Sequence, residues 1–193
     1  MSLDVVVLGP PGAGKGTQAK LIEADRGIPQ IATGDMLRAA IAAGTELGGR
    51  VKAVVDSGEL VPDALMIELI REKLGENGAR QGFVLDGFPR TLAQAEALDE
   101  MLANLQRKLS VALEFHLPED VAVERLVGRA RKEGRSDDTL EVIKRRLEVF
   151  HVQTGPVLEH YRAQGILVQI HAGRSVADVE VEVQQALEAA SAR

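Results

Sequence analysis

The residues with the clearest chemical potential lie near the N-terminus, where residues 9–17 read Gly-Pro-Pro-Gly-Ala-Gly-Lys-Gly-Thr. They follow a short apolar run, residues 5–8, and fit the phosphate-binding pattern G-x-x-x-x-G-K from Gly9 to Lys15. The glycines let the backbone curl so that several N–H groups point at a polyphosphate, and Lys15 brings a cation to its β and γ oxygens. The helix that we expect next offers its positive N-terminal end to the same anion. The spacing therefore predicts binding of a nucleoside triphosphate.

The end of this loop departs from the usual pattern. Gly16 stands where Ser or Thr is usual, and Thr17 follows it. The dinucleotide fingerprint G-x-G-x-x-G does not fit, because the third glycine counted from Gly12 and Gly14 would fall on Thr17. A plain glycine turn with an exposed lysine is the alternative, but an apolar run before the loop and a helical pattern after it favour a phosphate site.

A second cluster, residues 82–90, reads Gly-Phe-Val-Leu-Asp-Gly-Phe-Pro-Arg. A buried strand would end at Asp86, where a phosphate-loop protein carries the acid that holds Mg²⁺, usually through water. Alone, such an aspartate is more often a turn or cap residue, but a neighbouring phosphate loop favours the metal role. Arg90 follows closely, and its planar guanidinium can bind a phosphate with two hydrogen bonds.

Arginines gather around the remaining motifs of an acidic chain. The net charge is −6, which argues against nucleic-acid binding and means that an anionic substrate needs a local group of cations. Five arginines are candidates for that group: Arg38, Arg125, Arg129, Arg135 and Arg146. Arg125 and Arg129 share one face of a predicted helix, since they are four residues apart.

Short apolar runs alternate with longer helical patterns along the chain. The predicted strands are residues 4–8, 29–32, 82–86, 111–116 and 166–171. They lack polar alternation, as expected of strands buried on both faces of a parallel sheet. Helical periodicity covers residues 91–107, 139–161 and 176–190. This alternation predicts a three-layer α/β sandwich that binds ligands at the carboxyl ends of its strands.

Two segments do not fit the alternation. Residues 32–61 hold two short helical patterns separated by Gly44 and Gly48-Gly49, and we expect a projecting lobe whose first helix is capped by Thr33. Residues 128–138 carry four basic residues and two glycines, and we expect an exposed flap in which Ser136 caps the next helix.

Composition limits the remaining classes of function. The 193 residues suffice for one domain, and the absence of Cys excludes disulfides and thiolate zinc sites. Neither a secretory leader nor a run of 18 apolar residues is found, so the sequence predicts neither secretion nor membrane spanning and is compatible with the cytoplasm.

Together these motifs resemble the adenylate kinase family of the nucleoside-monophosphate kinases. The resemblance rests on GPPGAGKGTQ at residues 9–18, TGDMLR at 33–38, GELVPD at 58–63, LDGFPRT at 85–91 with Gln94 after it, Gly128-Arg129, and GRSDD at 134–138. The Lys-Gly-Thr ending of the loop is normal in this family. The resemblance implies a phosphate-loop kinase fold with a five-stranded parallel sheet, a monophosphate-binding lobe at 32–61 and a lid at 128–138. The implied reaction is MgATP + AMP ⇌ MgADP + ADP.

The resemblance also implies residue roles. The ATP phosphates would be held by Pro10, Pro11, Gly12, Ala13, Gly14, Lys15, Gly16 and Thr17, and the rest of ATP by Arg125, Arg129, Gly173 and Arg174. AMP would be held by Thr33, Arg38, Glu59, Leu60, Val61, Gly87, Phe88, Pro89, Arg90, Gln94, Arg135 and Arg146. The catalytic cations would be Lys15, Arg90, Arg125, Arg129, Arg135 and Arg146. Mg²⁺ would be held by Thr17 and Asp86 through water.

The lid resembles the short form of the family, and with no Cys we expect Mg²⁺ as the only metal and no zinc. The implied partners are ATP, AMP and ADP, with neither nucleic acid nor membrane, for a cytoplasmic monomer. A UMP or CMP kinase is the nearest alternative, but relatives that use pyrimidines usually carry Ala at the position of Thr33 and Asn at those of Thr91 and Gln94. A non-catalytic nucleotide-binding module is the second alternative, and the guanine-reading N-K-x-D motif is absent.

Overall fold

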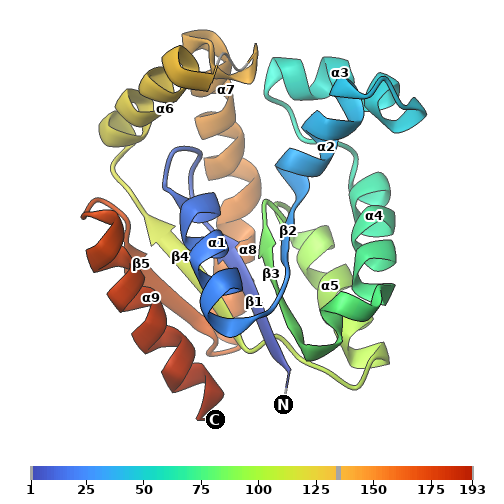
Figure 1. The fold of residues 1–193 in the computed structure, drawn as a ribbon. Coiled ribbons are helices and arrows are strands. Elements are labelled where there is room, and N and C mark those ends of the chain that lie inside the picture. The colour runs from blue at the N-terminus through green and yellow to red at the C-terminus, as the bar shows by residue number, and fades with distance from the viewer. Residues whose placement is uncertain (1, 134–135, 193) are drawn as a thin grey trace.

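The computed structural model describes residues 2–133 and 136–192. Its strands are β1 (Leu3–Leu8), β2 (Gln30–Ala32), β3 (Gly82–Asp86), β4 (Val111–His116) and β5 (Leu167–His171). They form one parallel sheet in the order β2-β3-β1-β4-β5 (Figure 1), which confirms the predicted five-stranded sheet. The chain moves to opposite sides of β1 when it enters β3 and β4, and such a switch point is where α/β sheets bind ligands.

The helices fall into a group that covers the sheet and a group that rises above its carboxyl edge (Figure 1). The first group is α1 (Lys15–Arg26), α4 (Asp63–Gly75), α5 (Leu92–Asn104), α8 (Gly155–Ala163) and α9 (Val176–Ser191). The second group is α2 (Thr33–Ala42), α3 (Glu46–Ser57), α6 (Glu119–Glu133) and α7 (Leu140–Val149). Shorter turns are the 3₁₀ helices η1 (Asn77–Gln81) and η2 (Ser136–Asp138) and the π-helical turn η3 (Phe150–Thr154). Within the described residues, no helix has the length and apolar character needed to cross a membrane.

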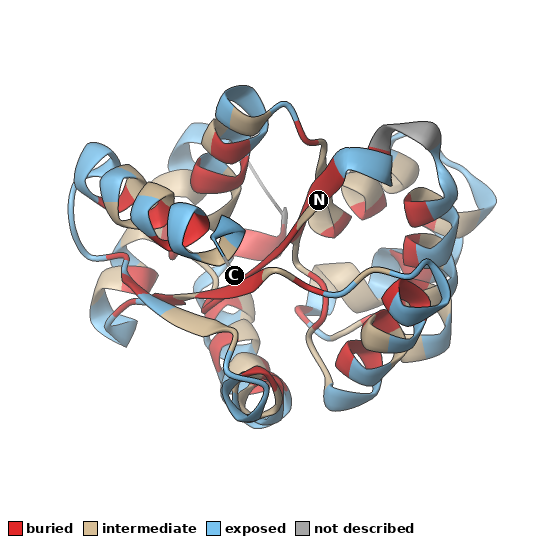
Figure 2. Ribbon diagram, turned by 90° about the horizontal axis from the view of Figure 1, so that it is seen from below, coloured by how far each residue is buried: buried red, intermediate tan, exposed pale blue. Residues whose placement is uncertain are grey.

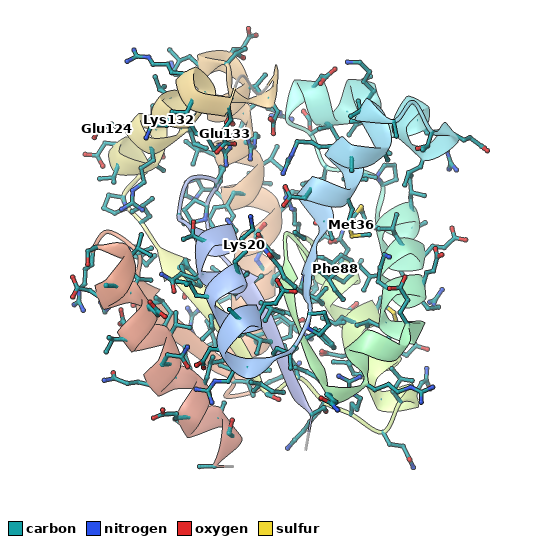
Figure 3. The ribbon with its side chains drawn as sticks, in the orientation of Figure 1. Lys20, Met36, Phe88, Glu124, Lys132 and Glu133 are labelled. Carbon is teal, nitrogen blue, oxygen red and sulfur yellow. The ribbon has the colours of Figure 1, made fainter. Side chains whose placement is uncertain are left out.

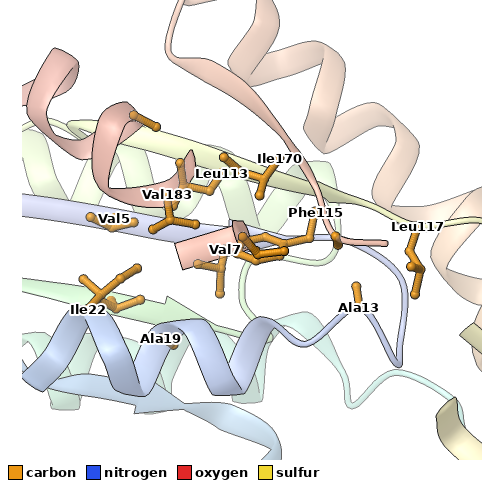
Figure 4. Packing of buried hydrophobic residues seen from close by; sticks show 14 of the residues in the cluster. Val5, Val7, Ala13, Ala19, Ile22, Leu113, Phe115, Leu117, Ile170 and Val183 are labelled. Carbon is orange, nitrogen blue, oxygen red and sulfur yellow. The ribbon is translucent and has the colours of Figure 1, made fainter. Parts of the chain in front are cut away.

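Two hydrophobic cores lie on the two faces of the sheet. Val5 and Val7 of β1 join the core under α1 and α9, which Figure 4 shows at close range. Val6 and Leu8, the alternate residues of the same strand, join the core under α4, α5 and α8. Figure 2 shows the buried residues concentrated on the strands and on the helix surfaces that face them. Both faces of β1 are thus covered, which explains its unbroken apolar run and confirms the three layers.

The lobe at residues 32–61 is built on the close packing of α2 against α3. A Cβ at residue 48 would lie 2.2 Å from the carbonyl oxygen of Ala40, so only glycine permits this approach. Gly48 and Gly49 lie inside α3 rather than between helices, so the predicted break there is wrong. The chain turns at Gly44, and Thr45 caps α3 by accepting a hydrogen bond from the Gly48 N–H.

The lid at residues 128–138 is less exposed than the sequence suggests. Helix α6 runs through Gly128 to Glu133, while Gly134 and Arg135 lie outside the described residues. In η2 the acids Asp137 and Asp138 are buried, because arginines surround them. The expectation of an exposed flap is therefore wrong for Asp137 and Asp138.

The pattern at residues 139–161 predicts one helix, but the structure has two helices joined by a π-helical turn. Thr139, rather than residue 136, caps α7 by accepting a hydrogen bond from the Val142 N–H. The α-helical hydrogen bonding then stops at Val149, and η3 connects α7 to α8. The spacing of apolar residues at 139–161 does not mark where one wider turn interrupts a helix, so a single helix was predicted.

Candidate functional site

The loop between β1 and α1 curls because three of its glycines have positive φ angles: Gly9, Gly12 and Gly14. A Cβ at residue 9 would lie 2.6 Å from the carbonyl oxygen of Phe115, and one at residue 12 would lie 2.8 Å from that of Ala122. The loop is therefore held between β4 and the first turn of α6. Its residues Pro11, Gly12, Gly14, Lys15, Gly16 and Thr17 line one open cleft.

Lys15 folds back over this loop. Its Nζ donates hydrogen bonds of 2.8 Å to the carbonyl oxygens of Gly9 and Pro10. Burial of the ammonium group, with the charges of Arg90, Arg146 and Arg129, lowers the pKa of Lys15 to about 8, although the carboxylate of Asp86 opposes the shift. A bound triphosphate would add negative charge beside Nζ and raise this pKa again.

We expect the affinity of the free protein for ATP to fall as the pH rises through about 8, the pKa of Lys15. Neutral Lys15 cannot balance the phosphate charge, and the apparent Kd should approach a rise of about tenfold per pH unit above the pKa. Titration of binding between pH 6.5 and 9.5 measures this rise. The variant Lys15→Met should bind ATP weakly at every pH, and its Kd should show no rise near pH 8. A wild-type Kd that stays constant to pH 9.5 would contradict the assignment.

Asp86 ends β3 beside the phosphate loop and lines the same cleft as Thr17. Its Oδ2 lies 3.2 Å from where a Cβ of residue 16 would stand, so the glycine leaves room for this carboxylate. Oxygen ligands next to phosphate-binding N–H groups are the environment that Mg²⁺ prefers. The residues present therefore fit an Mg²⁺ ion that arrives with a polyphosphate.

A second cavity lies between the phosphate cleft and the lobe. Nine of the residues predicted to hold a monophosphate line it: Thr33, Arg38, Glu59, Leu60, Val61, Gly87, Arg90, Gln94 and Arg146. The prediction missed Gly34, Leu37, Val55, Gly58, Met66 and Asp137. Leu37, Val55 and Met66 are apolar helix residues that nothing in the sequence separates from core positions.

Phe88 and Pro89 do not line this second cavity. Phe88, labelled in Figure 3, is fully buried in the core under α4, α5 and α8. Pro89 lines a neighbouring cavity behind the phosphate loop, together with Lys15 and Arg90. Thr33 was expected to cap α2, but Ala32 occupies that position and the Thr33 hydroxyl donates to the Asp86 carbonyl at 3.2 Å.

The turn after Asp86 places Arg90. Arg90 Nε donates to the Gly87 carbonyl at 2.9 Å, and the Arg90 N–H donates to Gln94 Oε1 at 2.8 Å. A Cβ at residue 87 would lie 2.6 Å from Thr33 Oγ1 and 3.1 Å from Arg90 Nη2, so only glycine fits between them. Burial of the guanidinium lowers the pKa of Arg90, and Arg38 lowers it further, while Asp86 and Asp137 oppose the shift.

Asp63, which the sequence reasoning missed, connects α4 and α5 beneath the second cavity. Its carboxylate accepts a 2.7 Å hydrogen bond from Gln94 Nε2 and a 3.0 Å hydrogen bond from Thr91 Oγ1. Because Gln94 Oε1 also accepts a hydrogen bond from the Arg90 N–H, both ends of the Gln94 amide are paired with protein groups. This arrangement fixes the side of the cavity from which Arg90 projects.

The lid contributes acids as well as arginines. Arg129 makes a bidentate ion pair with Asp138, with distances of 2.6 and 2.7 Å, and Arg146 donates to Asp138 Oδ1 at 2.8 Å. Asp137 lies 3.2 Å from Arg146 and 3.9 Å from Arg38. Burial lowers the pKa of Arg146 to about 10, although Asp137 and Asp138 oppose that shift. The lid thus places carboxylates among the arginines of the cleft.

Among the described residues, five arginines line the phosphate cleft: Arg38, Arg90, Arg125, Arg129 and Arg146. Lys20 of α1 and Glu133 at the end of α6, both labelled in Figure 3, also line it. Arg135 belongs to the predicted set but lies outside the described residues. Glu59, on the lobe, pairs with the exposed Arg145 of α7 at 2.6 Å.

A third cavity opens at the side of the phosphate loop, between α1, α6 and the start of α9. Arg125 lines it and donates from Nη1 to the carbonyl oxygen of Ala172 at 2.9 Å. Arg174 lines it too, while Gly173 is the residue between Ala172 and Arg174. The sequence reasoning missed Gln18, whose buried amide donates to the Val176 carbonyl at 2.9 Å. The cavity is thus lined by two arginines, Arg125 and Arg174, together with small residues of the phosphate loop and the start of α9.

Comparison with known proteins gives one consistent result. Residues 7–166 match the family model described as adenylate kinase. The adenylate kinase of Thermobifida fusca is 48% identical over 189 residues, which cover 98% of each chain. The adenylate kinase of Caulobacter vibrioides is 47% identical over 190 residues, covering 98% of this chain and 100% of the relative. That of Leptospira biflexa is 49% identical over 175 residues, covering 91% and 94%.

Proposed function

This chain belongs to the adenylate kinase family, and from that premise we propose how its residues carry out the reversible transfer of a phosphoryl group from ATP to AMP. The enzyme converts one ATP and one AMP into two ADP. One observation carries the residue assignment. The phosphate cleft and the second cavity share Arg38, Arg90 and Arg146, so an anion in either place meets the same cations.

We assign ATP to the phosphate cleft and the third cavity. The loop N–H groups and Lys15 hold its phosphates, with the N-terminal end of α1 beside them. Arg125 and the backbone around Ala172 hold the base, because they enclose the third cavity. Thr17 and Asp86 hold the Mg²⁺ that accompanies ATP, and this ion neutralises charge on the phosphate oxygens when bound.

We assign AMP to the second cavity. Arg38 and Arg90 project into it and can bind the phosphate, as guanidinium groups do with two hydrogen bonds. Leu60, Val61 and Met66 supply apolar surface for the base, and Thr33 and Gln94 supply polar groups beside it. The AMP phosphate would then face the γ-phosphate of ATP across Arg90 and Arg146.

Transfer between these sites requires orientation and charge neutralisation rather than a base. The AMP phosphate is already anionic near neutral pH and can attack the γ-phosphoryl group without losing a proton to the protein. Lys15 and the arginines neutralise the charge on the transferring oxygens. The lid excludes water that would otherwise hydrolyse ATP, and the contacts of Asp137 with Arg38 and of Asp138 with Arg146 support this role.

We further propose that the enzyme acts as a cytoplasmic monomer and carries no zinc. Residues of a single chain line all three cavities, so no second copy is needed to complete the site. ATP and AMP are found in the cytoplasm, which supports that location. The chain lacks the Cys residues of a thiolate zinc site, which supports the absence of zinc.

Two arginine substitutions should separate the nucleotide sites. With ATP and Mg²⁺, the wild-type enzyme should form diphosphate from AMP in clear preference to UMP, CMP or GMP. Arg38→Ala should raise the KM for AMP by about tenfold or more and the KM for ATP by clearly less, because Arg38 lines the second cavity as well as the phosphate cleft, whereas Arg125 does not line the second cavity. Arg125→Ala should do the reverse. Initial rates with each nucleotide varied in turn measure both effects.

Each variant is the control for the other, since both lose an arginine at the cleft. Preferred transfer to UMP or CMP by the wild type would show that the acceptor cavity is wrongly assigned. Binding of ATP without transfer to any monophosphate would favour a nucleotide-binding module. Equal changes in both KM values in either variant would contradict the separate sites.

A further inference from the structure

The π-helical turn η3 joins the helix that carries Arg146 to the helix that packs on the sheet. Helix α7 holds Arg146 at the cleft, and α8 buries Val157 and Tyr161 in the core. Turns with π-helical hydrogen bonding are rare and occur frequently at functional sites. No residue of η3 has a role in the assignment above, so the reason for the turn lies elsewhere.

Thr154, the last residue of η3, makes an unexpected hydrogen bond. It is 5% exposed and precedes α8 at the capping position, yet its side chain makes no capping hydrogen bond. A threonine there usually accepts a hydrogen bond from the first turn of its own helix. The hydroxyl instead donates to the carbonyl oxygen of Arg90 at 3.1 Å, across 64 residues of sequence.

This hydrogen bond completes the support of Arg90. Its N–H is bonded to Gln94, its Nε to the Gly87 carbonyl, and its carbonyl to Thr154. Thr154 also lines the cavity behind the phosphate loop, whose other walls include Lys15, Arg90 and Arg146. The hydroxyl therefore lies beside the cations that meet the transferring phosphate.

We propose that Thr154 is a positioning residue for Arg90, and that the π-helical turn exists to direct its hydroxyl to the Arg90 carbonyl. Through this contact the segment that carries Arg146 also holds the backbone of Arg90, so the distance and orientation between the two guanidinium groups stay fixed. The inference rests on the proposed role of Arg90 in phosphoryl transfer. Small displacements of a positioned group cost large factors in rate, which gives the contact its importance.

The variant Thr154→Val removes the hydroxyl and keeps the side-chain shape. We expect kcat to fall by about tenfold, with the KM for ATP nearly unchanged, because a misplaced Arg90 affects the transition state more than ATP binding. Thr154→Ser keeps the hydroxyl and should retain kcat within about twofold. Should the valine variant fail to fold, Thr154→Ala compared with Thr154→Ser provides the same test.

A double-mutant cycle separates positioning from a general structural effect. In an Arg90→Ala background, Thr154→Val should cause no further loss of kcat, since the group that it positions is gone. Thr139→Val is the matched control, because it removes the capping hydroxyl of α7 at the other end of the same helical segment. It should lower the melting temperature and leave kcat unchanged.

The outcomes distinguish this inference from the assignment on which it rests. Full activity of Arg90→Ala would overturn the role of Arg90 and the inference together. An inactive Arg90→Ala enzyme combined with unchanged kcat in Thr154→Val would overturn the inference alone. Equal losses from Thr154→Val in both backgrounds would also overturn it, because they would indicate a structural role.

Discussion

Replacing Arg90 by alanine should lower kcat at least ~10²-fold while the protein keeps its fold. A single arginine that stabilises the transferring phosphoryl group can contribute about 10³–10⁵ in rate. Arg90 lines both the phosphate cleft and the second cavity, so the loss should affect AMP binding and transfer together. Steady-state kinetics in both directions, with circular dichroism as the check on folding, measure this effect.

The same substitution should not destabilise the protein. Burial and the nearby charge of Arg38 lower the pKa of Arg90, which means that the folded state bears a cost for keeping it charged. Removing the guanidinium relieves that cost, so the melting temperature should stay the same or rise, as is common when groups of an active site are removed. The control is Arg71→Ala, which removes an exposed arginine of α4 and should change neither rate nor stability. A loss of kcat under tenfold would contradict the assigned role.

The sheet was predictable because its strands are buried on both faces. Every predicted strand agrees with the observed one to within a residue at each end, since apolar runs such as Val5–Leu8 have no polar position that could face water. The phosphate loop was predictable for a related reason. Close contacts with Phe115 and Ala122 require glycine at residues 9 and 12, and the resulting glycine spacing can be recognised in the sequence.

Contacts between distant residues left no such pattern. Asp63 looks like an ordinary acid in a first helical turn, and its hydrogen bonds to Thr91 and Gln94 arise only when α4 meets α5. The buried state of Asp137 and Asp138 likewise depends on Arg129 and Arg146, which come from two different helices. Capping residues and apolar periodicity can be recognised within a short stretch of sequence. The roles of Asp63, Asp137 and Asp138 instead depend on contacts between helices that are distant in sequence.

The motif at residues 85–91 shows the same limit on a smaller scale. Residues Gly87 to Arg90 were assigned to AMP as a block, but the chain turns at Gly87, so neighbours face different surroundings. Gly87 and Arg90 line the second cavity, Pro89 lines the cavity behind the phosphate loop, and Phe88 lies in the core. A motif identifies a segment, and only the backbone path determines which of its side chains can meet a ligand.

The second large effect is expected far from the chemistry, where Arg107→Met should lower the free energy of unfolding by about 3–5 kcal/mol, the usual cost of breaking a buried ion pair. Asp4 is completely buried at the start of β1, and Arg107 meets both of its carboxylate oxygens, with Nε 2.9 Å from Oδ2. Arg107 also donates to the Ala79 carbonyl at 2.8 Å and stacks 5.3 Å from the Phe83 ring centroid. Urea unfolding followed by circular dichroism measures the loss.

The reason is that methionine fills the space of Arg107 but leaves Asp4 without its counter-charge. Replacing both partners, as Asp4→Leu with Arg107→Met, should recover most of the stability, because an apolar pair of similar volume avoids the cost of burying charge. The control Arg80→Met removes an exposed arginine nearby and should have little effect. Catalysis by folded Arg107→Met should remain unchanged, since Asp4 lies at the end of β1 opposite the phosphate loop. A loss below about 1 kcal/mol, the range of exposed ion pairs, would show that water reaches the carboxylate.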